Sequence, residues 1–110
     1  MVVPGEQTVN KIKRVDVAGT KTWHDYDNAL GTRPAAITVN LYQDDVLFDT
    51  ATATADDGWA YQFTGLPEAA ANGAIHVYTV QEEAVEHYAT VIDGTAIANT
   101  LDPKLNDIAR

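Results

Sequence analysis

Three polar side chains, Lys21, Glu82 and Asn99, each continue an otherwise apolar face of a predicted β-strand. Residues two apart in a strand point to the same side, so counting in twos groups each of them with aliphatic or aromatic neighbours. The three series are Val15, Val17, Gly19, Lys21 and Trp23; Tyr78, Val80 and Glu82; and Ile97 and Asn99.

Each of the three has an ordinary explanation when it is considered alone. A lysine can extend its amine to solvent, a glutamate at a strand end can face water, and a buried asparagine can bond to the backbone. An amine, a carboxyl and a carboxamide together are a more specific set. Burying an isolated ammonium or carboxylate is costly, so we expect Lys21 and Glu82 to pair or to become neutral by exchanging a proton.

The composition describes one globular domain and excludes several classes of function. The chain has 110 residues, 45% of them hydrophobic and 21% charged. Its formal charge of −9 argues against binding to nucleic acid or to anionic lipid, because both are polyanions. The sequence contains no cysteine and no serine, which excludes disulfides, thiolate metal sites and the serine and cysteine hydrolase mechanisms. A hydrolase would need another nucleophile, such as a threonine, and no threonine has a recognisable site around it.

Short strands separated by turns run through the whole chain, and no stretch has a helical period. Seven such strands predict an all-β fold, a single antiparallel β-sandwich. We expect the domain to span residues 14–102, with linkers or tails at 1–13 and 103–110. The expected strands are 14–23, 35–43, 46–54, 58–64, 74–83, 87–92 and 95–101.

Turn signals set the expected connections between these strands. The segment "QDD" is predicted to turn the chain between the second and third strands, and "DDG" at 56–58 to form the next hairpin. The alanines of "LPEAAANG" are expected to form one helical turn. In "WAYQF", alternation places Trp59, Tyr61 and Phe63 on the core face.

Neither end of the chain carries a recognisable targeting signal. The segment "MVVPGEQTVNKIKR" lacks the apolar region of a secretory signal, and no apolar run approaches the roughly 20 residues that a membrane span requires. No sorting motif is present. We therefore expect the chain to be an excised module of a longer protein.

From Val15 to Leu101, the order of several motifs closely resembles the Cna B-type repeat domains of Gram-positive surface adhesins and pilins. The motifs are "GTKTWHDYDN", "RPAAITVNLY", "DGWAYQFTGLP", "YTVQE" and "IANT". The resemblance implies an inverse immunoglobulin-like, transthyretin-like β-sandwich. Two turn details depart from the family: Asp45 stands where a glycine is common, and "EHY" at 86–88 replaces the usual Gly-Tyr.

Many members of that family form a spontaneous intramolecular isopeptide bond. In it a lysine near the first strand joins an asparagine on the last, assisted by an acidic residue on a central strand. The matching positions are Lys21 before "TW", Asn99 in "IANT" and Glu82 at the end of "YTVQE". These are the residues that strand parity selects.

Burial suits these residue types to that reaction. An apolar environment favours the neutral amine of Lys21, which is the nucleophilic form, and the neutral acid form of Glu82. The acid can then hydrogen-bond the Asn99 carboxamide, stabilise its developing charge and shuttle protons. Attack on Asn99 Cγ with loss of ammonia gives the amide, and holding both groups on rigid strands replaces a very high concentration of reactants.

The resemblance implies a structural stalk or spacer module, not an enzyme acting on other molecules. Its expected partners are sister repeat domains in the same chain and, as a further option, a host matrix protein or glycan. The expected location is extracellular, as part of a wall-anchored surface protein. We expect no cofactor, no metal, no nucleic acid and no membrane insertion, and a monomer as an isolated module.

Other residues remain open as alternatives at the proposed site. Glu83 adjoins Glu82, and an error of one residue in strand parity would exchange their roles. Lys11 and Lys13 offer other amines, but Lys11 lies in a polar stretch and both precede the strand expected at 14–23.

Other functions would depend on other parts of the sequence. A ligand-binding adhesin domain would use an exposed loop such as "HDYDNALGTRP", for which a solvated connector is the preferred interpretation. Calcium binding at Asp25 and Asp27 would need ligands that an EF-hand supplies further along the loop, where Ala29, Leu30 and Ala36 stand instead. The histidines, His24, His76 and His87, lack metal-ligand spacing and are expected mostly at the surface.

Overall fold

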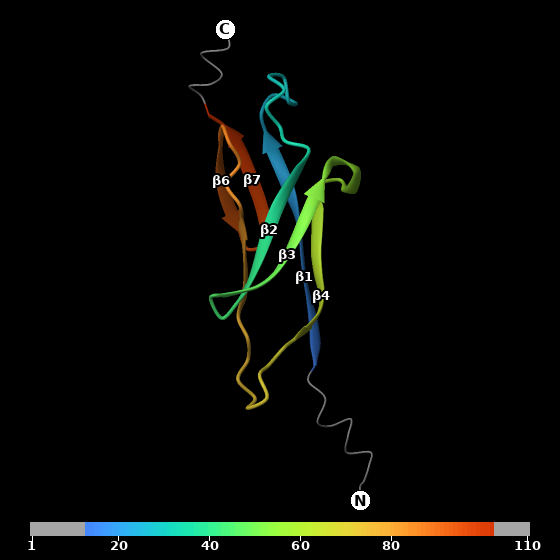
Figure 1. The fold of residues 1–110 in the computed structure, drawn as a ribbon, viewed down its shortest axis with the longest axis vertical. Helices are drawn as coiled ribbons and strands as arrows, with labels where there is room; N and C mark the ends of the chain where they lie inside the picture. The colour runs from blue at the N-terminus through green and yellow to red at the C-terminus, as the bar shows by residue number, and fades with distance from the viewer. Residues whose placement is uncertain (1–12, 103–110) are drawn as a thin grey trace, which may run out of the picture.

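The computed structural model describes residues 13–102, and in this range seven strands form two facing sheets (Figure 1). One sheet has the strand order β4-β1-β7-β6 and the other β3-β2-β5. The predicted β-sandwich is confirmed. The elements are β1 (Arg14–His24), β2 (Ala36–Gln43), β3 (Val46–Thr54), the 3-10 helix η1 (Ala55–Asp57), β4 (Ala60–Pro67), β5 (Tyr78–Glu82), β6 (Tyr88–Asp93) and β7 (Ala96–Leu101).

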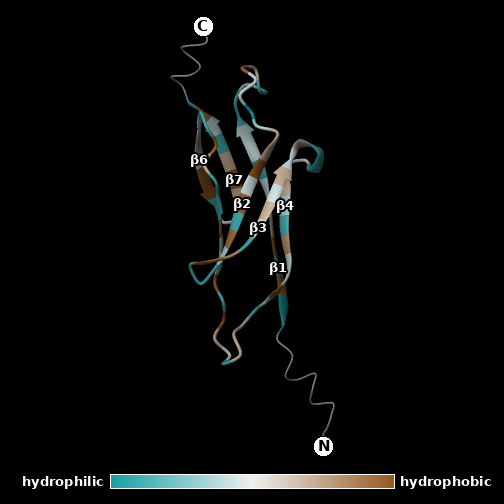
Figure 2. Cartoon of the chain, in the orientation of Figure 1, coloured by the Kyte–Doolittle hydropathy of each residue, from teal (hydrophilic) through white to brown (hydrophobic). Residues whose placement is uncertain are grey.

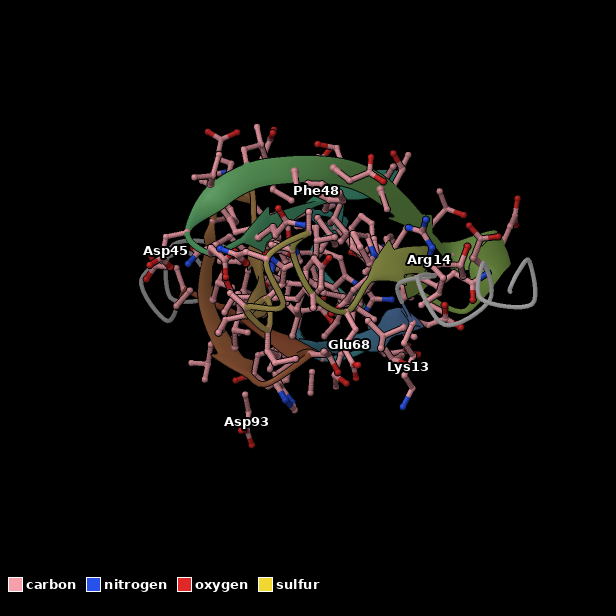
Figure 3. All side chains as sticks on the ribbon, turned by 90° about the horizontal axis from the view of Figure 1, so that it is seen from below. Lys13, Arg14, Asp45, Phe48, Glu68 and Asp93 are labelled. Atoms are coloured by element: carbon pink, nitrogen blue, oxygen red, sulfur yellow. The ribbon has the colours of Figure 1, made fainter. Side chains whose placement is uncertain are left out.

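Period-2 alternation explains why these segments form strands and which side faces the core. On β2 the odd-numbered residues from Ile37 to Leu41 are buried and their neighbours are partly exposed. The same alternation colours the strands in bands of apolar and polar residues (Figure 2), and the buried side chains fill the space between the sheets (Figure 3). The core consists of Ile37, Val39, Leu41, Ala53, Tyr61, Phe63, Leu66, Val80 and Ile97.

The strand β1 is shared between two neighbours, and this sharing positions the candidate site. Residues 14–20 pair antiparallel with β4, whereas residues 21–24 pair in parallel with β7. The other strand pairs are antiparallel. Lys21 is the first residue after the exchange of partner, and its backbone N–H donates to the Trp59 carbonyl at 2.8 Å.

Three local expectations are wrong. The "DDG" segment does not close a hairpin, because β3 and β4 belong to different sheets and η1 carries the chain across the edge between them. The strand β5 begins at Tyr78 rather than at residue 74, since residues 74–77 make only an isolated bridge, between Ile75 and Ala69. The alanines 69–71 form no helical turn. The crossing at η1 depends on which sheet each strand joins, which local turn signals do not report. Residues 68–76 instead form a local turn, closed by backbone hydrogen bonds from Ala70 to Ala74 and from His76 to Glu68.

The predicted tails, 1–13 and 103–110, lie outside the described residues except for Lys13. Within residues 13–102, no helix is long and apolar enough to cross a membrane.

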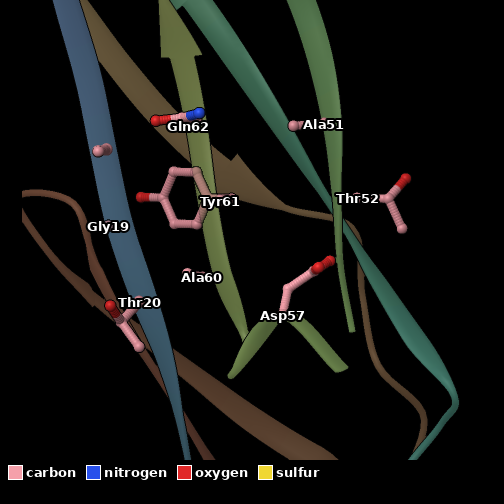
Figure 4. Close-up of a pocket in the computed structure, with 9 residues that line it drawn as sticks. Gly19, Thr20, Ala51, Thr52, Asp57, Ala60, Tyr61 and Gln62 are labelled. Atoms are coloured by element: carbon pink, nitrogen blue, oxygen red, sulfur yellow. The ribbon is translucent and has the colours of Figure 1, made fainter. Parts of the chain in front are cut away.

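Gly19 occupies a position on β1 where the chain needs a residue without a side chain. The Tyr61 hydroxyl reaches over it from β4 to donate to the Thr95 carbonyl, and Figure 4 shows this hydroxyl directed toward β1. A Cβ at position 19 would lie 2.1 Å from the Thr95 oxygen and 2.5 Å from the Tyr61 hydroxyl. Both distances are far below van der Waals contact.

We therefore expect Gly19→Ala to lower the free energy of unfolding by about 2 to 3 kcal/mol, as overpacking does in a core that cannot relax. Thr20→Ala, a change at the next, exposed position, is the matched control and should cost about 0.5 kcal/mol or less. Urea unfolding of both variants checks the prediction, which equal midpoints would contradict.

Candidate functional site

Lys21 and Glu82 meet between the two sheets. Lys21 comes from β1 of the four-stranded sheet, and Glu82 ends β5 of the three-stranded sheet, opposite Val39 in register. The Lys21 amine forms an ion pair and hydrogen bond with Glu82 Oε2, and both side chains are 0% exposed. A wholly buried ion pair contributes little net stability, because removing both charges from water offsets their attraction. Its presence in the core therefore calls for another explanation.

Asn99 lies on the strand next to Lys21 and on the same face. The parallel register of β1 and β7 pairs Lys21 with Ile97 and Trp23 with Asn99, so Lys21 and Asn99 are diagonal neighbours. Asn99 is 0% exposed, and neither its Nδ2 nor its Oδ1 atom has a hydrogen-bond partner among the described residues. An unsatisfied buried polar group costs roughly 1 to 3 kcal/mol, so this carboxamide is costly as it stands.

The environment of Lys21 favours its nucleophilic form. Burial lowers the pKa of the Lys21 amine, and the hydrogen bond and charge of Glu82 only partly oppose this. The amine also lies 4.2 Å from the centre of the Trp23 ring. Trp23 in turn packs edge-on against Trp59 and Tyr88.

The structure distinguishes Glu82 from its neighbour. Glu83 is exposed, and its side chain accepts a hydrogen bond from Asn40 on the outer face of the sheet, whereas Glu82 points inward. Lys13 is exposed and pairs with Glu68 at 3.9 Å, and Lys11 lies outside the described residues. Among the described residues, Lys21, Glu82 and Asn99 thus share one buried region. Their role in a cross-link stays a prediction.

A second buried polar cluster was not expected from the sequence. Asp25 is 1% exposed, and its carboxylate accepts two hydrogen bonds from the Arg33 guanidinium, at 2.6 and 3.1 Å. It also accepts from the Tyr88 hydroxyl at 2.8 Å and the Asn28 backbone at 3.1 Å, while Thr32 contacts the Tyr88 hydroxyl. The hydrogen bonds from Arg33 are the main cause that lowers the pKa of Asp25, against its burial.

This cluster fixes the connection between β1 and β2, for which the sequence favours a solvated connector over a ligand-binding loop. Asp25 and Arg33 tie its two ends together, although Tyr26 between them is 69% exposed. The Arg33 guanidinium lies 5.2 Å from the centre of the Trp23 ring, the same ring that the Lys21 amine contacts. In the sequence, the sign of this pair is that Asp25 and Arg33 carry opposite charges and stand eight residues apart. That spacing alone does not show that the loop folds back to bring them together.

No group of three metal-ligating side chains comes together among residues 13–102. The carboxylate of Asp25, one of the two candidate calcium ligands, forms an ion pair with Arg33 instead. His24 and His87 are exposed, as expected, whereas His76 is half-buried and contacts Asp44 at 2.6 Å.

A groove of about 740 Å³ lies on the side of the sandwich where β3 and β4 are the edge strands. Its lining is made largely of small side chains (Figure 4). It includes none of Lys21, Glu82 and Asn99, so it is separate from the buried cluster. The lining residues are Ala18, Gly19, Thr20, Ala51, Thr52, Asp57, Ala60, Tyr61 and Gln62.

The sequence of the chain is similar to that of a known family. Residues 17–100 match the Cna protein B-type domain. A collagen adhesin of Staphylococcus aureus is 36% identical over 96 residues, which are 87% of this chain and 8% of that protein. The chain therefore spans only a small part of the length of this relative.

Solved structures agree in fold. A single B repeat unit of the collagen-binding surface protein of Staphylococcus aureus has a TM-score of 0.78 and 36% identity, with 81% of this chain and 47% of that chain covered. The pilus backbone of Streptococcus pneumoniae has a TM-score of 0.55 and 23% identity, with 79% and 34% covered. At that identity, the second likeness concerns the fold alone.

Proposed function

The chain belongs to the Cna protein B-type domain family, and from this premise we propose that it is a structural spacer module of a bacterial surface adhesin or pilin, stabilised by a self-formed Lys21–Asn99 isopeptide bond. The observation that carries the proposal is the partnerless, fully buried carboxamide of Asn99 beside a buried Lys21–Glu82 pair. Conversion of this carboxamide to a secondary amide would remove its unsatisfied NH₂ group.

The proposed reaction needs no group from outside the chain. Proton transfer from the Lys21 ammonium to Glu82 leaves a neutral amine and a neutral acid. The amine nitrogen attacks Asn99 Cγ, and Glu82 stabilises the carbonyl oxygen and delivers a proton to the leaving nitrogen. The Nζ–Cγ bond forms and the Cγ–Nδ2 bond breaks. Glu82 gives its proton to Nδ2, which leaves as ammonia, and takes one proton from Nζ, so Glu82 ends as the neutral acid. The reaction occurs once per molecule, so the protein is not an enzyme toward other substrates.

The path of mechanical load through the fold supports the same function. β1 and β7 are neighbouring parallel strands, and the start of β1 and the end of β7 lie at opposite ends of the sandwich (Figure 1). Tension applied at these two points would shear β1 against β7. A covalent bond between Lys21 and Asn99 would carry that tension directly, so the segment between them would not need to unfold.

The proposed setting follows from the relatives. A related solved structure is a repeat unit of a surface protein, which supports sister repeats in the same chain and an extracellular location for this module. Anchoring to a cell wall and contact with a host protein or glycan would be properties of the longer protein.

Mass spectrometry of the intact, denatured protein tests the bond. We expect the wild type to be lighter than its sequence by one ammonia, because one Cγ–Nδ2 bond has been replaced. Lys21→Ala, Glu82→Ala and Asn99→Ala should each retain the full sequence mass, since each lacks the nucleophile, the proton shuttle or the electrophile.

A Lys13→Ala variant serves as the control, because this exposed lysine lies outside the site and its removal should leave the loss of ammonia intact. A wild type at full sequence mass would rule out the cross-link and leave a plain connector domain.

A further inference from the structure

Glu82 has two carboxylate oxygens, and they face different partners. Oε2 pairs with the Lys21 amine, whereas Oε1 accepts a hydrogen bond from the Thr90 hydroxyl at 3.1 Å. The reaction proposed above assigns no role to Thr90. This threonine is nevertheless the second side chain that holds the carboxyl group between the sheets.

The position of Thr90 in the fold connects it to both halves of the site. It lies on β6 directly opposite Asn99 on β7, so the two side chains share a face. Its hydrogen bond to Glu82 crosses from the four-stranded sheet to β5, the edge strand of the other sheet. Thr90 itself is exposed while the Glu82 side chain is 0% exposed. The threonine therefore stands between the buried acid and solvent.

We propose that Thr90 is a positioning residue for the Lys21–Asn99 reaction, an inference that rests on the proposed function. The terminal torsion of a glutamate has a broad energy minimum, so one hydrogen bond from Lys21 does not fix the plane of the carboxyl group. The Thr90 hydroxyl, which is held in place by β6, supplies a second hydrogen bond to the carboxyl group. It keeps Oε2 toward the amine, and it keeps the acid next to Asn99.

The hydroxyl group also suits both protonation states of Glu82. It can donate to a carboxylate oxygen and, after rotation, accept from a protonated acid. It therefore retains a hydrogen bond to Glu82 throughout the proton transfers. Valine has nearly the shape of threonine but can neither donate nor accept, whereas serine keeps the hydroxyl and loses the methyl group.

The rate of cross-linking in freshly made protein tests this role. The full chain is produced by cell-free synthesis, translation is stopped, and the fraction that has lost ammonia is followed over time by mass spectrometry of denatured samples. We expect Thr90→Val to slow the reaction roughly tenfold or more, because the Glu82 carboxyl group is then no longer held in the reactive orientation. Thr90→Ser should stay within about threefold of the wild type, because the hydroxyl remains.

The control is Thr79→Val, which alters an exposed threonine on the same strand as Glu82 but on its outer face. It should cross-link at the wild-type rate. To show that Thr90→Val folds, its urea unfolding is compared with that of Thr90→Ser in chains that also carry Asn99→Leu and cannot react. Similar midpoints assign the slow reaction to positioning and not to instability.

The outcomes separate the two proposals. A wild type that loses ammonia, together with Thr90→Val at the same rate, overturns the positioning role alone. A slow Thr90→Ser with a normal Thr90→Val also overturns it, since the methyl group would then be the part that matters. A wild type that never loses ammonia overturns the proposed function and this inference with it.

Discussion

Replacing Asn99 with leucine should lower the free energy of unfolding by roughly 4 to 5 kcal/mol, because the cross-link it removes closes a loop from residue 21 to residue 99. By chain-entropy arguments a loop of this length strongly restricts the unfolded state. For a domain of this size the loss corresponds to roughly 20 to 35 °C in melting temperature. Thermal and urea unfolding of the wild type and the variant measure it.

Leucine is chosen because it removes the Lys21–Asn99 cross-link without disturbing the Lys21–Glu82 ion pair. It replaces a buried carboxamide that has no hydrogen-bond partner, so no existing hydrogen bond is lost. The Lys21–Glu82 pair stays in place, so no buried charge is left alone. The remaining change at position 99 is the loss of the electrophile.

A second background tests whether the loss belongs to the bond. In a Lys21→Met chain no cross-link can form, and Asn99→Leu should then raise the free energy of unfolding by roughly 1 to 3 kcal/mol, because it removes a buried carboxamide without a hydrogen-bond partner. The bond can be lost only once, so the two substitutions cannot add. A loss of 4 to 5 kcal/mol in both backgrounds, on the scale of the loop estimate, would show that Asn99 stabilises the fold in some other way.

Replacing Asp25 with alanine should destabilise the fold by about 3 to 5 kcal/mol, because it leaves the Arg33 charge in a largely buried position without its partner. The Tyr88 hydroxyl and the Asn28 backbone also lose their acceptor. Asp27→Asn, at an exposed aspartate of the same connection, is the matched control and should cost about 0.5 kcal/mol or less. Urea unfolding at neutral pH compares them.

Acid should remove the same contribution in the wild type. The pKa of Asp25 is lowered in the folded state, chiefly by the hydrogen bonds from Arg33. Its stabilising effect is therefore complete above the unfolded pKa of about 4 and is lost as the pH falls through the lower, folded value. The difference between wild type and Asp25→Ala should shrink below about pH 4. A difference that is constant with pH would contradict a role for the carboxylate charge.

The two buried clusters are coupled through one ring. The centre of the Trp23 ring lies 4.2 Å from the Lys21 amine and 5.2 Å from the Arg33 guanidinium. Tyr88 packs against the same ring and donates to Asp25. Arg33 and Tyr88, which both bind Asp25, therefore also contact the ring that lies beside the proposed nucleophile.

The sequence by itself determined which side chains face inward. Alternation along a strand is a local property of the backbone, so Lys21, Glu82 and Asn99 could be assigned to the core without knowing which strands are neighbours. The same local pattern, with turn residues between strands, predicted the β-sandwich and most strand bounds. It favoured Glu82 over Glu83 but left Glu83 open, and the structure, which places the two on opposite faces, decided between them.

Only the tertiary structure decided which of these inward side chains meet. The exchange of partners by β1, from β4 to the parallel β7, sets Lys21 diagonally beside Asn99, and the pairing of β6 with β7 brings in Thr90. The crossing of η1 between sheets and the late start of β5 were likewise missed. The burial of Asp25 depends on Arg33 and on Tyr88 from a distant strand. Contacts between segments far apart in the chain arise from packing of the whole domain, and no local period or turn residue encodes them.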